Sequence, residues 1–162
     1  MIIRPAESGD AQGIADLVNP VIRDTTITFT TQERTVAGVA RAIADTGAYF
    51  VACDGAVILG YACHFPFRSG PGYAHAREHS ITLSPAARGR GLGRDLMRVL
   101  EDYARDQKIH VMMAGVSAEN PAGVAFHAAI GYREVGRLPQ VGRKFDRWID
   151  LVLMQKILGM SP

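Results

Sequence analysis

The sequence predicts one α/β domain, in which a single mixed and twisted sheet carries helices on both faces. Three observations support this fold class. Segments with strand or helix periodicity follow one another in the order β-α-α-β-β-β-α-β-α-β-β. One strand runs directly into a glycine-rich turn and a long amphipathic helix. The chain has 162 residues, 48% of them hydrophobic, which is enough to bury a core. We expect a single domain over residues 1–162, without repeats or linkers.

The first 31 residues are expected to form a short strand, a helix and a loop. The strand covers residues 2–4. Ser8 or Asp10 can cap the helix, whose apolar residues recur on one helical face. These residues are Ile14, Leu17, Val18, Val21 and Ile22. Pro20 should end or kink the helix, because proline lacks the N–H that an interior helical position needs. The polar, β-branched residues 25–31 are expected to be loop or extended chain.

A second helix and a β-hairpin are expected next. Thr35 can cap this helix, and Gly47 can end it. Residues 49–53 and 56–65 have the composition of strands. Asp54-Gly55 lies between them and is typical of a two-residue hairpin turn.

The strand over residues 80–83 leads into the most informative stretch of the chain. A turn containing Pro85 follows, and Gly89, Gly91 and Gly93 then occupy every second position as a helix begins. Glycine lets the backbone approach a ligand closely. The free N–H groups in the first turn of a helix, together with the helix dipole, favour phosphate. This stretch therefore predicts a pyrophosphate cradle. The helix has one apolar stripe, formed by Leu92, Leu96, Val99, Leu100, Tyr103 and Ala104.

The last third of the chain predicts a central strand, a short helix and two closing strands. Residues 109–116 are apolar enough for a strand in the middle of the sheet. Asn120 can cap the short helix, with Pro121 at its first position, and the helix is expected to end at Ile130-Gly131. The closing strands are expected over residues 132–137 and 148–155, with a connection over 138–145.

Composition argues against several classes of function. The formal net charge of +2 is small and scattered, whereas nucleic-acid-binding proteins usually present a concentrated basic face. The N-terminus lacks the apolar core of a signal peptide, and no apolar run approaches the roughly 20 residues of a membrane span. We therefore expect a soluble cytoplasmic protein that binds small molecules, with no nucleic-acid or membrane partner.

The cysteines and histidines indicate neither a disulfide nor a metal site. If Asp54-Gly55 forms the hairpin turn, Cys53 lies beside it and Cys63 lies far along the ladder, so the two thiols cannot bridge. Both are expected to be reduced and mostly buried. His75 and His79 share a strand face but lie about 13 Å apart by strand rise, which is too far for one zinc ion.

The glycine pattern distinguishes between nucleotide-binding motifs. A P-loop requires Gly-Lys followed by Ser or Thr, but Gly93 is followed by Arg94-Asp95. A dinucleotide fingerprint that starts at Gly89 requires a third glycine where this chain has Arg94. The pattern that fits is Arg-x-x-Gly-x-Gly, from Arg88 to Gly93, between a strand and a helix. It resembles the acetyl-CoA-binding motif of the GCN5-related N-acetyltransferases (GNAT).

Further segments resemble one branch of this superfamily, the phosphinothricin and methionine sulfoximine N-acetyltransferases. They are Glu78-His79-Ser80, residues 120–132, and residues 139–150 with the sequence Val-Gly-Arg-Lys-Phe. The resemblance covers nearly the whole chain and implies a GNAT-type sheet. It also implies direct transfer of acetyl from acetyl-CoA to the primary amine of a small amino-acid analogue, without an acyl-enzyme. A homodimer is a further expectation at the family level.

The resemblance assigns roles to particular residues. A free α-amine has a pKa of about 7.7 to 8.0, so a base must remove its proton, and Glu78 is the candidate. In the alternative interpretation Glu78 is a surface carboxylate. His127 stands where many relatives have a tyrosine, and it could protonate the departing thiolate, serve in packing or contact CoA. The expected contacts with acetyl-CoA are Ile81, Thr82, Leu83, Arg88, Gly89, Arg90, Gly91, Leu92, Gly93, Arg94 and Asn120.

The acceptor side resembles the branch less closely. The residues expected to line the acceptor pocket are Phe29, Gly72, Tyr73 and His75. However, Ala74 and His75 stand where the branch usually has an arginine and a tyrosine, and Arg77 stands where an apolar residue is usual. These departures leave open another acceptor, such as a polyamine, a peptide N-terminus or another metabolite. A CoA-binding module without catalysis is the third possibility, because the cradle is clearer than the acceptor site.

Overall fold

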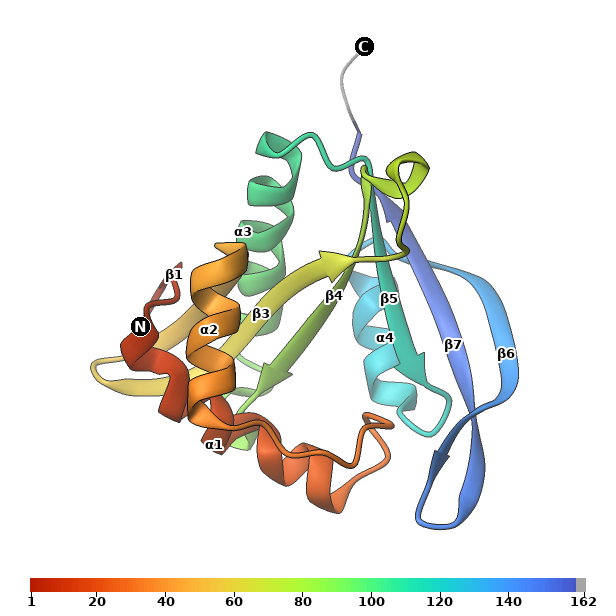
Figure 1. Cartoon of the computed structure of the whole chain (residues 1–162), viewed down its shortest axis with the longest axis horizontal. Coiled ribbons are helices and arrows are strands. Elements are labelled where there is room, and N and C mark those ends of the chain that lie inside the picture. The colour runs from red at the N-terminus through yellow and green to blue at the C-terminus, as the bar shows by residue number, and fades with distance from the viewer. Residues whose placement is uncertain (160–162) are drawn as a thin grey trace.

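The computed structural model describes residues 1–159 and contains one seven-stranded mixed sheet in the order β1-β2-β3-β4-β5-β7-β6 (Figure 1). The elements are β1 (Ile2–Pro5), α1 (Ala11–Asp24), α2 (Val36–Thr46), β2 (Tyr49–Asp54), β3 (Val57–Pro66), β4 (Ala76–Leu83), α3 (Leu92–Asp106), β5 (Val111–Ser117), α4 (Pro121–Ala129), β6 (Arg133–Lys144) and β7 (Arg147–Ile157), with short 3-10 helices at Ser8–Asp10, Pro71–Tyr73 and Pro85–Ala87. The fold class and the order of elements are those that the sequence predicts. No helix within residues 1–159 is long and apolar enough to span a bilayer.

The sheet separates two hydrophobic cores, because the residues of a strand alternate between its faces. On β2, Tyr49 and Val51 pack with α1 and α2, whereas Phe50 and Ala52 belong to the core beneath α3. Helix α4 joins the second core through Phe126. Both faces of the sheet are therefore covered by helices, as predicted.

Helix α1 continues through Pro20 to Asp24, so of the two effects expected of this proline, an end or a kink, the first is wrong. Pro20 leaves the carbonyl group of Asp16 without its helical N–H partner. Both residues are exposed, so water can satisfy this carbonyl. Meanwhile Ile14 and Ile22, on either side of the proline, are buried against the sheet and hold both halves of the helix in place.

The helix caps agree with the sequence in position but not always in mechanism. Asp10 directly precedes α1, yet its side chain does not cap that helix. Its carboxylate instead accepts hydrogen bonds from Arg4 and from the N–H of Glu7. Thr35 caps α2 through its hydroxyl group, and Gly47 ends α2 with a φ of +61°, both as predicted.

The β2–β3 hairpin turns at Gly55-Ala56, one residue later than predicted. Asp54 pairs with Val57 and so belongs to the ladder. Gly55 occupies the first turn position with a φ of +57°, which glycine adopts without strain. Cys53 lies beside the turn and Cys63 near the far end of the hairpin, and both are free and buried, as expected.

Strands β6 and β7 are longer than predicted. The segment 138–145, expected as a connection, is mostly strand, and the chain turns tightly at Phe145-Asp146. A bulge between Leu138 and Gly142 interrupts the ladder and accommodates Pro139, which cannot donate a ladder hydrogen bond. The bulge and the proline hide the alternation that would otherwise have predicted a strand here.

Parallel strands β4 and β5 pair over only three positions and then diverge. Their last paired residues are Glu78 and Met113. Beyond this point β4 remains paired with β3 as far as Leu83, so the backbone of residues 79–83 lacks a neighbour on the β5 side. In Figure 1 the α1–α2 connection runs below the diverging ends of the two strands.

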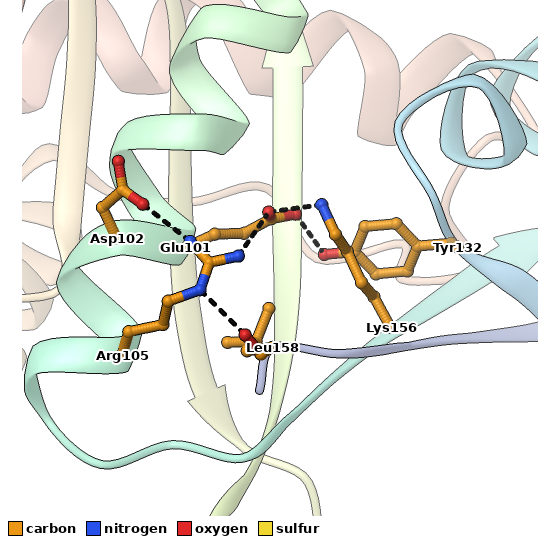
Figure 2. A network of polar contacts seen from close by, with 6 residues as sticks. All are labelled: Glu101, Asp102, Arg105, Tyr132, Lys156 and Leu158. Carbon is orange, nitrogen blue, oxygen red and sulfur yellow. Dashed lines mark hydrogen bonds and ion pairs between the residues drawn. The ribbon is translucent and has the colours of Figure 1, made fainter. Parts of the chain in front are cut away.

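A network of charged side chains ties α3 to the last strand (Figure 2). Glu101 of α3 is buried and accepts hydrogen bonds from Lys156 (2.6 Å) and from the hydroxyl of Tyr132 (3.1 Å). Arg105, one turn further along α3, donates to the carbonyl of Leu158 at 3.0 Å. A buried carboxylate is tolerated when it is paired in this way, and these contacts join α3 to β7 and to the residue that follows β7.

Candidate active site

Two cavities open where β4 and β5 diverge. One, of about 410 Å³, contains Glu78 in its wall and lies beside the α1–α2 connection. The other, of about 440 Å³, lies against the glycine-rich turn and α4. We call them the Glu78 cavity and the glycine-turn cavity. Ile81, Thr82, Asn120 and His127 line both, so the two cavities adjoin.

The glycine-turn cavity presents free backbone groups and a positive charge. Gly89 and Gly91 have φ values of +73° and +76°, and a Cβ at either position would point into open space. Their conformation, rather than crowding, therefore calls for glycine. Helix α3 starts at Leu92, so the N–H groups of its first turn lack helical partners. Arg88 lines the cavity together with the unpaired backbone of residues 81–83. This combination suits an extended ligand that ends in phosphate.

The remaining residues of the predicted cradle have different environments. Leu92 and Gly93 are buried, with Leu92 in the core under α3. The side chain of Arg94 lines a separate cavity of about 340 Å³, which it shares with Arg98 and Glu101. Arg90 is exposed and lines none of these three cavities. Sequence reasoning missed three residues of α4 that line the glycine-turn cavity, which are Ala122, Gly123 and Phe126.

Glu78 occupies the point where the two strands separate. Its side chain lies over Gly115 of β5, since a Cβ at position 115 would come within 2.8 Å of Glu78 Oε1. The carboxylate is half-buried and forms no hydrogen bond or ion pair within residues 1–159. Burial raises the pKa of this carboxyl group. An unpaired carboxylate with a raised pKa in a cavity wall can accept a proton from a ligand.

His127 is hydrogen-bonded through both ring nitrogens. Its Nδ1–H donates to the carbonyl of Gly123 at 2.7 Å, so the neutral ring can only accept through Nε2. His79 Nε2 lies 3.0 Å from His127 Nε2 and must therefore be the donor. Burial, and then the proximity of His127, lowers the pKa of His79 to about 3, and burial lowers the pKa of His127. Two neutral rings thus join β4 to α4 beside the cavities.

The α1–α2 connection is held over the Glu78 cavity by β6. The ring of Phe29 packs directly on Gly142, where any side chain would collide with it. Lys144 is buried, and its Nζ donates to the carbonyl of Thr28 at 2.8 Å. Burial lowers the pKa of Lys144. The Val-Gly-Arg-Lys-Phe segment therefore fixes one wall of the cavity, a function that its sequence did not reveal.

Residues 19–132 match the sequence model of the Acetyltransferase (GNAT) family. The chain belongs to the GNAT family. It is 37% identical over 167 residues to the L-amino acid N-acyltransferase MnaT of Escherichia coli (strain K12), covering 96% of this chain and 92% of MnaT. It is 36% identical over 160 residues to the L-methionine sulfoximine/L-methionine sulfone acetyltransferase of Salmonella typhimurium, covering 96% and 93% of the two chains. The crystal structure of a GNAT superfamily phosphinothricin acetyltransferase from Sinorhizobium meliloti, in complex with AcCoA, has a TM-score of 0.90 and 31% identity over 98% of this chain and 88% of that one.

These matches confirm the family, the branch and the acetyltransferase activity that the motifs indicated. Within this GNAT acetyltransferase, Phe29 lines the Glu78 cavity, whereas Gly72, Tyr73 and His75 do not. Tyr73 is exposed, and His75 donates through Nδ1 to the carbonyl of Lys108 at 2.7 Å. Residues of the cavity that sequence reasoning missed include Arg34, Tyr61, Phe65, Ser117 and Leu151. Within residues 1–159 no group of three or more His, Cys, Asp and Glu side chains is arranged to hold a metal ion.

Proposed function

We propose that this chain transfers the acetyl group of acetyl-CoA directly to the primary amine of a small amino-acid analogue, with Glu78 as the general base. The acceptor class is that of methionine sulfoximine, methionine sulfone and phosphinothricin, which the names of its relatives carry. One observation carries the proposal. A cavity suited to a phosphate-bearing ligand adjoins a second cavity whose wall holds an unpaired, half-buried carboxylate.

The residues of the glycine-turn cavity fit acetyl-CoA. The free backbone of residues 81–83 can hydrogen-bond the amide groups of the pantetheine arm, as an added strand would. The N–H groups of Gly89 to Arg94 and the guanidinium of Arg88 can hold the pyrophosphate. Bound there, acetyl-CoA supplies an activated thioester. Asn120 and His127 line both cavities and would therefore contact the reacting end.

Glu78 would make the acceptor nucleophilic. The α-ammonium group of a free amino acid has a pKa above that of a peptide N-terminus, which is about 7.7 to 8.0, so the acceptor is mostly protonated at neutral pH. One proton moves to the carboxylate of Glu78, and the freed nitrogen lone pair forms the C–N bond as the thioester C–S bond breaks. The nitrogen loses a second proton as it becomes the amide, and the departing CoA thiolate takes up that proton and leaves as the free thiol. The raised pKa of Glu78 brings the carboxylate closer to the pKa of the amine, which favours this transfer.

His127 would act as a positioning residue rather than as the acid that protonates the thiolate. Both of its ring nitrogens already have partners, namely the Gly123 carbonyl and His79. To present a proton on Nε2 toward the cavity, the ring would have to give up its hydrogen bond with His79. We therefore assign His127 the alternative role of contacting CoA and holding α4 against β4.

A thiol-release assay tests the proposed function. The purified chain is given acetyl-CoA and, in turn, methionine sulfoximine, methionine sulfone, phosphinothricin, a polyamine and a peptide with a free N-terminus. We expect thiol release with the first three and a rise in melting temperature with acetyl-CoA alone. Release only with the polyamine or the peptide would replace the acceptor class. Binding without release from any acceptor would make the chain a CoA-binding module. The cytoplasmic location and the homodimer stay predictions.

A further inference from the structure

Arg34 brings a cation to the wall of the Glu78 cavity. Of the residues that line this cavity, Arg34 and Glu78 are the two with charged side chains at neutral pH, since His79 and His127 are neutral. The rest of the wall is apolar or carries hydroxyl and amide groups. A ligand in this cavity therefore meets one positive and one negative group.

The charge of Arg34 is not committed to a partner within residues 1–159. Its sequence neighbour Glu33 pairs with Arg23, whose guanidinium lies 3.0 Å from the Glu33 carboxylate. Burial raises the pKa of Tyr61, another residue of the cavity wall, to about 12, and the positive charge of Arg34 opposes this rise. It has the same opposing effect on Cys63 beneath the wall. Arg34 is exposed overall, so the observation that places it at the site is that it lines the Glu78 cavity while its side chain has no carboxylate partner within residues 1–159.

The backbone of Arg34 is fixed even though it lies between two helices. Asn19 of α1 accepts a hydrogen bond from the N–H of Arg34 at 2.8 Å and donates to its carbonyl at 3.0 Å. Helix α2 begins two residues later, after its cap Thr35. The side chain is therefore presented from an anchored position, which lowers the entropy lost when it binds a ligand.

We propose that Arg34 binds the α-carboxylate of the acceptor, so that the cavity selects amino acids over amines without a carboxylate. This inference rests on the proposed function, because it takes the Glu78 cavity as the acceptor site. A guanidinium binds a carboxylate through two parallel N–H···O bonds. With the carboxylate held by Arg34, the ammonium group of the same molecule is directed to the other charged residue of the cavity, Glu78. Lys144, the buried cation nearby in the fold, is already bound to the Thr28 carbonyl and does not line the cavity.

The test compares methionine sulfone with its α-carboxamide, which replaces the carboxylate by a neutral group of similar shape. Because the amide also lowers the pKa of the α-amine, each acceptor is compared with itself across the protein variants. Arg34→Gln should lower kcat/KM for the carboxylate by about tenfold to a hundredfold and leave that for the carboxamide nearly unchanged. Arg34→Lys should be intermediate, because it keeps the charge and loses the two-pronged geometry. Arg41→Gln, which removes an exposed charge from α2, is the matched control and should behave like the unchanged chain.

Binding measured by calorimetry, with CoA present, keeps the inference separate from turnover. We expect methionine sulfone to bind the unchanged chain and the Arg41→Gln variant more tightly than the Arg34→Gln variant. Equal loss for the carboxylate and the carboxamide in the Arg34→Gln variant would overturn the inference, because Arg34 would then contact another part of the acceptor. The inference would also be overturned if methionine sulfone bound equally to the unchanged chain, the Arg41→Gln variant and the Arg34→Gln variant, or if it bound to none of them. Failure of acetyl transfer with Arg34-dependent binding intact would count against the proposed function alone.

Discussion

Replacing Glu78 with Gln is the sharpest test of the catalytic chemistry. The amide keeps the size of the side chain and cannot accept the proton of the ammonium group. A positioned base contributes about 10² to 10⁴ in rate, so kcat/KM for the acceptor should fall by that factor, or by about 3 to 5 kcal/mol of transition-state stabilisation. Glu78 does not line the glycine-turn cavity, so the affinity for acetyl-CoA should be unchanged.

The pH dependence of the same reaction carries the signature of Glu78. The base must be ionised, so kcat/KM should rise with pH and level off once the carboxyl group has lost its proton. Because burial raises the pKa of Glu78, this rising limb should lie at higher pH than for an exposed glutamate. The Gln variant should lose the plateau that follows ionisation of Glu78. Its residual rate should keep rising with the unprotonated fraction of the acceptor, up to the pKa of the amine.

Stability measurements distinguish a lost base from a damaged fold. In the folded chain burial disfavours the ionised carboxylate, so the folded-state pKa of Glu78 lies above its unfolded value. The resulting penalty on stability is absent below the unfolded pKa and complete above the folded one. Glu78→Gln should therefore be as stable as the unchanged chain at about pH 4 and at least as stable at about pH 8. A variant that folds and binds acetyl-CoA normally, yet releases thiol at the original rate, would remove Glu78 as the base.

A second variant perturbs the same carboxylate from the opposite strand. A methyl group at Gly115 would lie 2.8 Å from Glu78 Oε1, which is too close for both to stay in place. Gly115→Ala should displace the carboxylate and lower kcat/KM by a smaller factor than Glu78→Gln. Because Glu78 is still present, the rising limb of the pH profile should persist in this variant. Unchanged kinetics would show that the position of the carboxylate over β5 does not matter for the reaction.

Three other substitutions test the supporting structure. His79→Phe should raise the KM for acetyl-CoA several-fold, because His127 loses the hydrogen bond that ties α4 to β4. The rising limb of the pH profile should persist, since Glu78 is unchanged. An unchanged KM would show that the two histidines have no function in binding acetyl-CoA. Lys144→Met should raise the KM for the acceptor by about tenfold and spare that for acetyl-CoA, because the α1–α2 connection loses its tie to β6. Glu101→Gln should lower the free energy of unfolding in urea by about 2 to 3 kcal/mol, because it leaves Lys156 without its partner; a loss within error of zero would contradict the assigned network.

The sequence predicted the strand, the glycine-rich turn and the helix over residues 80–106 well, because the information for them is local. A strand, a turn with three glycines and a helix lie within residues 80–106, so spacing alone indicates their geometry. The cap at Asn120 is likewise a short-range contact, in which its side chain accepts from the N–H of Gly123. Where prediction failed locally, a specific feature misled it, such as the exposed face that lets α1 continue through Pro20 or the bulge that interrupts β6.

The Glu78 cavity, which we propose as the acceptor site, could not be predicted in the same way, because its wall is assembled from segments far apart in the chain. Arg34 has no periodic or motif signal, and only the fold shows that it faces the same cavity as Glu78. The reverse holds for Gly72 and Tyr73, whose place just before β4 suggested an acceptor site but which do not line the cavity. These two residues precede the N-terminal end of β4, where β4 and β5 are still paired, whereas the cavity opens beyond Glu78. Nearness to β4 in sequence therefore does not indicate nearness to the cavity.

The divergence of β4 and β5 connects the two halves of the site and explains why Glu78 stands where it does. Up to Glu78 the two strands satisfy each other's backbone groups, and beyond it β4 offers its backbone to a ligand. A residue at this boundary is still fixed by the sheet and already faces the opening, so it is rigid and accessible at once. The preceding residue, Arg77, lies where β4 and β5 are still paired. The following residue, His79, points to the opposite face of β4 from Glu78 and bonds with His127. Alternation along β4 therefore gives the proposed base, Glu78, and the residue that bonds with α4, His79, adjacent positions on a single strand.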